Sequence, residues 1–192
     1  TLTSDGDFIG SSLTADMLAQ TYASLGEWDR AEDALRRSRA LAAKSGDPKA
    51  ITDAEISAAG VALERGELDR AVAMAKNAAR NAEAMGSPAC SIVANFIAGT
   101  AELAAGRFAG AVESYGRSNQ LSIELDEGWF RNYTDAGLNA ARCGLGGDLE
   151  AARADWERTL ARARELDDPS MEADIRFGRA QTLAAVPGAD LA

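Results

Sequence analysis

Apolar and polar residues recur along this chain with a period of about forty residues. Four segments share one order: a glycine, a polar residue, a large apolar residue, two variable positions, an alanine and, four positions further on, another apolar residue. They begin at Gly26, Gly66, Gly106 and Gly147, so the spacings are 40, 40 and 41 residues. A nearly constant spacing over four matches indicates an internal structural repeat.

Within each segment, apolar positions four residues apart fall on one face of an α-helix. The leading glycine permits the left-handed turn that ends one helix and leads into the next. The small residues that follow allow two helices to cross closely: Ala31, Ala71, Ala111 and Ala152. The pattern therefore predicts antiparallel helix pairs joined by glycine turns, with no β-strand.

A second, longer link joins each pair to the next. Three links end in a polar residue and a proline: Asp47-Pro48, Ser87-Pro88 and Asp168-Pro169. Such pairs favour the start of a helix, because the polar side chain caps it and proline suits its first position. We predict first helices over residues 12–25, 48–65, 88–105, 128–145 and 169–185, and second helices over 28–45, 68–85, 108–125 and 149–166.

These elements make about four and a half helix–turn–helix repeats. The units cover residues 12–47, 48–87, 88–127 and 128–168, with a partial unit at 169–188. Residues 1–11 are predicted to form an N-terminal segment or linker, and residues 189–192 the truncated start of a further helix. Because a solenoid normally ends in a polar capping helix, and the pattern shows none here, we expect these residues to be cut from a longer array or a multidomain protein.

The run Leu18, Tyr22, Gly26, Trp28, Ala31 and Leu35 resembles a tetratricopeptide repeat (TPR). The resemblance covers residues 12–188 and implies an all-α fold, an α-α superhelix of the TPR-like solenoid type, with a right-handed twist. Later units depart from the family pattern, since Ala62 and Glu102 replace the expected tyrosine, and the period exceeds the usual ~34 residues. Elongated units of this kind are similar to the arrays of bacterial multidomain signalling ATPases, nucleotide cyclases and transcription activators.

The charge of the chain narrows the choice of partner. Thirty Asp and Glu against twenty Lys and Arg give a net charge of −10, which repels phosphate backbones and anionic membranes. No window approaches the ~20 apolar residues of a membrane span, and the N-terminus lacks the pattern of a signal peptide. We expect a cytoplasmic protein whose partner is neither a nucleic acid nor a membrane.

Residues suited to catalysis are scarce. The sequence contains no histidine, the commonest general base, and Cys90 and Cys143 share no metal-ligand spacing. The GLGGD stretch at 144–148 lacks the rest of a phosphate-binding motif and coincides with a repeat turn. We therefore predict no enzyme activity, no metal and no cofactor, and two reduced, buried cysteines.

The family resemblance implies that one face of the first helices lines a concave groove. Residues placed there as candidate partner contacts are Asp16, Gln20, Ile56, Leu63, Val93, Phe96, Thr100 and Leu103. The Lys and Asn residues with which some family members clamp the C-terminus of a chaperone are absent. The apolar middle of this face suits an amphipathic helix, an apolar peptide or a neighbouring domain; equally, these residues could pack a tighter superhelix.

Three aromatic residues stand outside the repeat positions: Trp129, Phe130 and Tyr133. They either fill the seam between the third and fourth units or form an aromatic anchor for a partner.

The sequence thus predicts a protein–protein interaction or regulatory solenoid within a larger bacterial signalling or transcription-control protein. Its partner would be a protein or peptide, including another domain of the same chain. The alternative is a ligand-sensing domain that binds a small metabolite or short peptide in the concave groove.

Overall fold

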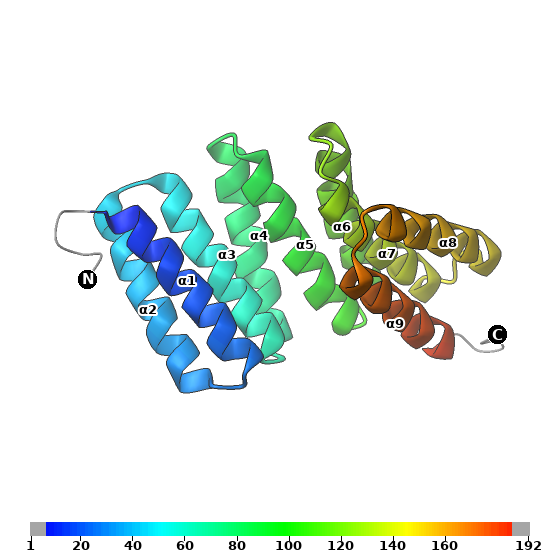
Figure 1. The fold of residues 1–192 in the computed structure, drawn as a ribbon, viewed down its shortest axis with the longest axis horizontal. Coiled ribbons are helices and arrows are strands. Elements are labelled where there is room, and N and C mark those ends of the chain that lie inside the picture. Colours follow the sequence, from blue (N-terminus) through cyan, green and yellow to red (C-terminus); the bar gives the residue numbers. More distant parts are fainter. Residues whose placement is uncertain (1–6, 186–192) are drawn as a thin grey trace. The chain divides into compact units, whose positions relative to one another are not determined.

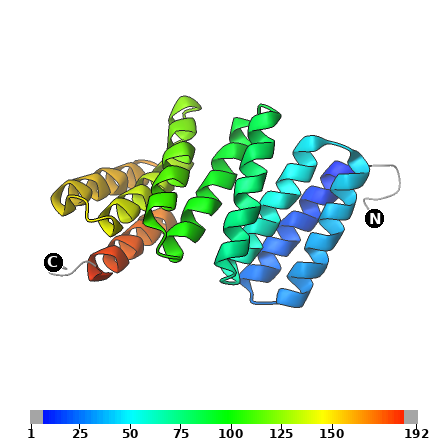
Figure 2. The same ribbon diagram turned by 180° about the vertical axis from the view of Figure 1, so that it is seen from behind.

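The computed structural model describes residues 7–185 of the 192-residue chain. This part is a succession of nine α-helices without a strand (Figures 1 and 2). The helices are α1 (Phe8–Ser24), α2 (Trp28–Ser45), α3 (Pro48–Glu64), α4 (Leu68–Ala84), α5 (Pro88–Ala104), α6 (Phe108–Glu124), α7 (Gly128–Gly144), α8 (Leu149–Glu165) and α9 (Pro169–Ala185). The all-α, TPR-like repeat fold is confirmed; the predicted start of a further helix at 189–192 lies outside the described residues.

The helices divide into two compact units, Thr1–Ala101 and Glu102–Ala192, whose boundary falls within α5. In the first unit, α1 packs against α2 and α3, α2 against α3, and α3 against α4. In the second, α6 packs against α7, while α7, α8 and α9 all contact one another. Each of these contacts joins helices one or two places apart along the chain, as expected of stacked repeats.

The first helix begins earlier than predicted. It starts at Phe8, not at residue 12, because Asp7 Oδ1 accepts a hydrogen bond from Gly10 N at 2.8 Å and caps the helix. The later first helices begin, as predicted, at the prolines Pro48, Pro88 and Pro169.

Three of the four predicted turn glycines, Gly26, Gly66 and Gly106, have positive φ. In the fourth pair it is Gly146, with φ 81°, that takes the left-handed conformation, and not Gly147 as predicted. The turn glycines are therefore 40 residues apart throughout, and the additional residue lies after the turn. As a result α1, α3, α5 and α7 correspond at intervals of 40, whereas α8 begins one residue late.

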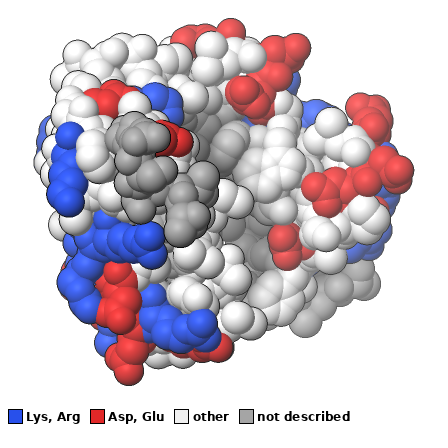
Figure 3. All heavy atoms as spheres, turned by 60° about the vertical axis from the view of Figure 1, so that its left-hand side comes forward, with Lys and Arg blue, Asp and Glu red and all other residues white. Residues whose placement is uncertain are grey.

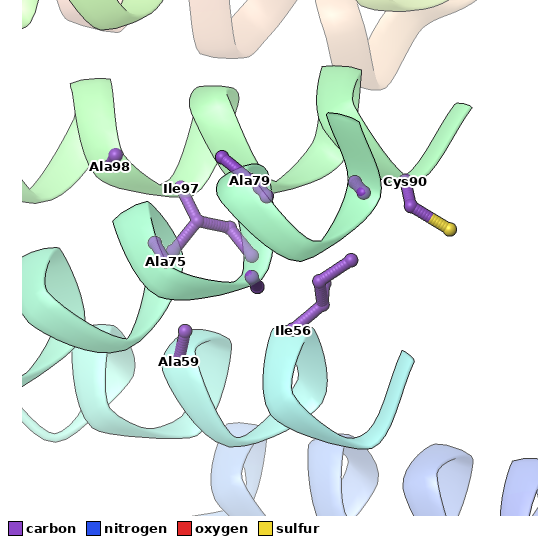
Figure 4. Packing of buried hydrophobic residues seen from close by; sticks show 10 residues of the cluster. Ile56, Ala59, Ala75, Ala79, Cys90, Ile97 and Ala98 are labelled. Carbon is purple, nitrogen blue, oxygen red and sulfur yellow. The ribbon is translucent and has the colours of Figure 1, made fainter. Parts of the chain in front are cut away.

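Small side chains build the core of the first unit. One cluster brings together residues of α3, α4 and α5 (Figure 4): Ile56, Ala59, Ala75, Ala79, Cys90, Ile97 and Ala98. Among the predicted crossing residues, 0% of the surface is exposed at Ala31, Ala71 and Ala111. Both cysteines are buried and free, as predicted.

Two links between repeats hold an aspartate in the left-handed conformation. Gly46 and Gly86 follow α2 and α4 with φ 67° and 66°, whereas Asp126 and Asp167 take the same places after α6 and α8 with φ 57° and 51°. Aspartate tolerates this conformation better than most residues do, yet it still costs free energy that glycine avoids.

We therefore expect Asp126→Gly to raise the free energy of unfolding by about 0.5–1 kcal/mol, measured by urea denaturation. Glu127→Gly is the matched control, because Glu127 has an ordinary φ of −83° and makes no side-chain cap. That control should lose stability. If Asp126→Gly also loses stability, the Asp126 side chain contributes more free energy to folding than its left-handed backbone conformation costs.

Candidate partner-binding surfaces

The predicted groove residues lie on α1, α3 and α5, and all except Leu103 belong to the first unit. Their exposure differs widely. Gln20 is exposed, and five residues are half-buried: Leu63, Val93, Phe96, Thr100 and Leu103. Asp16 and Ile56 are only 5% and 7% exposed, so they offer little surface to a partner.

Ile56 is buried because it belongs to the α3–α4–α5 cluster shown in Figure 4. Leu63, Val93 and Phe96 pack against the same cluster and remain partly exposed. These three side chains therefore combine a fixed position with apolar surface open to the outside. That combination is typical of contact residues in a binding surface.

The helix α1 adds further apolar surface. Ile9 and Leu13 are 43% and 42% exposed, and Met17 is 71% exposed. The only charged residue of α1 is the buried Asp16. Figure 3 turns this side of the chain forward, and uncharged surface occupies much of the middle of the view. Exposed apolar side chains grouped on one helix often mark an interaction site.

Asp16 itself is an anomaly of the core. Both of its carboxylate oxygens are buried without a hydrogen-bond partner in the described part of the chain. Ser38 Oγ shares a hydrogen bond with Ser12 Oγ. Ser57 Oγ accepts one from Gln20 Nε2 and keeps its own O–H to donate.

Burial raises the pKa of the Asp16 carboxyl above its ordinary value, and the charge of Asp53 adds to this rise. Ser38, Ser57 and Arg39 lie close enough to oppose it, but burial is the larger effect. A carboxylate in this place costs stability at neutral pH.

The aromatic residues predicted as an anchor differ in their exposure and contacts. Trp129 is 47% exposed, and its ring lies 4.8 Å from that of Phe130 and 4.7 Å from that of Tyr133. Tyr133 packs against the core of α7–α9 and donates a hydrogen bond to Asp174 Oδ2 at 3.1 Å. Burial and the nearby Asp174 raise the pKa of Tyr133 to about 12, so Tyr133 is a neutral packing residue and Trp129 is the exposed one.

One exposed aromatic residue was missed by the sequence analysis. Phe177 of α9 is 66% exposed, although its place in an apolar helix pattern favours burial. The repeat register offers the missing signal, because Phe177 corresponds to Ala136 of α7 and Phe96 of α5. All three stand at the position of a groove candidate.

A polar network joins the helices of the second unit. Arg162 of α8 donates to Asn132 Oδ1 of α7 at 2.8 Å and pairs with Asp135. Asn119 of α6 donates to Asp135 Oδ1 at 2.6 Å. Since each charge has a partner, this network serves to hold α6, α7 and α8 in register.

Within residues 7–185, no three His, Cys, Asp or Glu side chains come together in a way that could hold a metal ion. Among the described helices, none has both the length and the apolar character that crossing a bilayer requires.

No family model and no curated protein sequence matches the chain. Its fold is nevertheless similar to a solved structure, that of aspartyl phosphate phosphatase F from Bacillus subtilis. The TM-score is 0.77 at 14% sequence identity, over 93% of this chain and 46% of that one. The likeness shows a shared helical-repeat fold, and the chain spans about half the length of that protein.

Proposed function

We propose that the chain is a regulatory module that binds a protein or peptide partner on the exposed side of α1, α3 and α5. The observation that carries the proposal is the set of partly exposed apolar residues Leu63, Val93 and Phe96, which pack against a buried core. Extended faces of stacked helices are the usual binding surfaces of repeat proteins. An apolar helix face of the partner would suit this surface.

The parent molecule is proposed to be a larger cytoplasmic signalling or transcription-control protein of bacterial type, and the module itself to be without catalytic activity. The similarity in fold to a phosphatase carries no activity to this chain, because fold alone does not determine function. The sequence contains no histidine, and the buried carboxylates Asp16 and Glu102 belong to helix packing.

A photo-crosslinking amino acid at position 96, in the protein expressed in its native cells, would identify the partner. With that partner purified, Phe96→Ala should weaken binding by about 30-fold or more, as expected of a central aromatic contact. The control Glu113→Ala, on the exposed side of α6, should leave the affinity unchanged.

Phe108→Ala separates folding from binding, because the Phe108 ring packs directly on Gly144. It should lower the melting temperature while an intact first unit still binds. An unchanged affinity in Phe96→Ala would contradict the proposal and direct the search to Trp129.

A further inference from the structure

In each helix pair, one residue near the end of the first helix faces the start of the second. These corresponding residues are Tyr22, Ala62, Glu102 and Arg142. In the first pair, the Arg30 guanidinium lies 4.0 Å from the centre of the Tyr22 ring and donates to the Tyr22 hydroxyl at 2.9 Å. The chain's own side chains thus occupy this place.

The second and third pairs close the same place in other ways. In the second, Ala62 packs against Ala71 and Ala101 in a buried cluster. In the third, Glu102 is 3% exposed and accepts a hydrogen bond from Ser114 Oγ at 2.7 Å. Three different sets of residues therefore occupy this place in the first three pairs.

The fourth pair is open. A pocket of about 370 Å³ lies between α7, α8 and Val112 of α6. Arg142 and Asp155, which correspond to Glu102 and Ser114, both line it. The Arg142 side chain is exposed, and its guanidinium makes no hydrogen bond or ion pair with the described residues.

Two local changes account for the opening. The residue inserted after the turn delays the start of α8, and Gly146 and Gly147 of that turn line the pocket. In addition, Ala151 stands where the first pair has the long side chain of Arg30, so α8 offers little to fill the space.

The inner wall of the pocket contains Asn139, which is 4% exposed. Its side-chain amide makes no hydrogen bond within residues 7–185. The corresponding residues in the other pairs are small: Ala19, Ala59 and Gly99. The amide atoms are not among the fully buried polar atoms that lack a partner, so they are open to the pocket. A departure of this kind from a protein's own pattern is expected at functional sites.

The side chains around the pocket indicate a ligand with charges of both signs. The Arg142 guanidinium matches a carboxylate, and the Asn139 amide can both donate to and accept from a peptide group. Asp155 pairs with Arg158 through Oδ1, and its other carboxylate oxygen can accept a hydrogen bond from an ammonium group. Val112 and Ala152 provide apolar walls. The volume is at the lower end of the range of small-molecule sites, ~300–1,000 Å³.

We propose that this pocket binds a small zwitterion of dipeptide size, with its carboxylate on Arg142 and its amide on Asn139. The site lies in the second unit and does not depend on the protein-binding function proposed above for the first.

Titration of the ¹⁵N-labelled protein with L-alanyl-L-leucine, followed by NMR, tests the proposal. We expect saturable shifts of the Gly146 and Gly147 amide signals. Arg142→Ala and Asn139→Ala should each weaken binding at least tenfold. The charge-matched control Arg37→Ala, an exposed residue of α2, should bind as the native protein does.

A melting curve of each variant keeps folding and binding apart. Asn139→Ala should melt about 2 °C higher, because it places a better helix former in α7. Absence of shifts at millimolar dipeptide, or undiminished binding by Arg142→Ala, would overturn the proposal. So would an Asn139→Ala variant that melts lower and still binds. Phe96→Ala should leave dipeptide binding intact, so failure of one proposed site does not imply failure of the other.

Discussion

Replacing Gly137 by alanine should destabilise the second unit by about 2–3 kcal/mol, the typical cost of overpacking a core. Helix propensity alone would predict a gain of about 1 kcal/mol, since glycine is unfavourable inside a helix. The packing outweighs this gain, because a Cβ at position 137 would lie 2.6 Å from Cε2 of Tyr115. Tyr115 is 3% exposed and has little space to move.

Gly116→Ala is the matched control, since a Cβ there would meet nothing within 4 Å. In urea denaturation, Gly116→Ala should raise the free energy of unfolding by about 1 kcal/mol, whereas Gly137→Ala should lower it. Equal gains for the two variants would show that α6 and α7 do not approach as closely as described.

Asp16→Asn should stabilise the first unit by about 1–3 kcal/mol at neutral pH, because it removes a buried charge without a hydrogen-bond partner. The gain should depend on pH. The folded protein holds the Asp16 proton more tightly than the unfolded chain does, so the native protein loses stability as the pH rises from about 4 through the raised pKa. Above that pKa, the loss of stability caused by the Asp16 charge no longer changes with pH.

Urea midpoints at pH 4.5, 5.5, 6.5 and 7.5 should therefore show a gap between Asp16→Asn and the native protein that widens with pH. Asp33→Asn is the control for charge, since Asp33 is exposed and pairs only with Arg36 on the helix surface. Its effect should stay below about 1 kcal/mol at every pH. A constant gap for Asp16→Asn would mean that the carboxyl titrates as it does in water.

The helical repeat was predictable because each helix is specified by nearby residues. The glycine that ends a helix, the alanine at the crossing and the proline at the start all act within a few positions of themselves. At Gly146 and Gly147 this local information is ambiguous, because adjacent glycines can adopt the left-handed turn equally well. The consequence was that the turn glycine was predicted one residue too late, at Gly147 and not at Gly146.

The candidate sites depend on contacts that local patterns do not contain. Asp16 stands at a position assigned to the inner surface, yet Ser38 of α2 and Ser57 of α3 enclose it. The pocket at Asn139 depends on the residue inserted after the turn between α7 and α8, and on the small side chain of Ala151 in α8. Both features require the spacing between helices, which depends on side chains from several repeats.

Each helix contact described within a unit joins neighbours one or two places apart along the chain. Few long loops must close before such contacts form, which favours rapid folding and lets structure begin at any pair and spread to the next. Opening can likewise start at one end. Because α1 packs only against α2 and α3 in the first unit, its amide hydrogens should exchange with solvent before those of α3, which has neighbours on both sides.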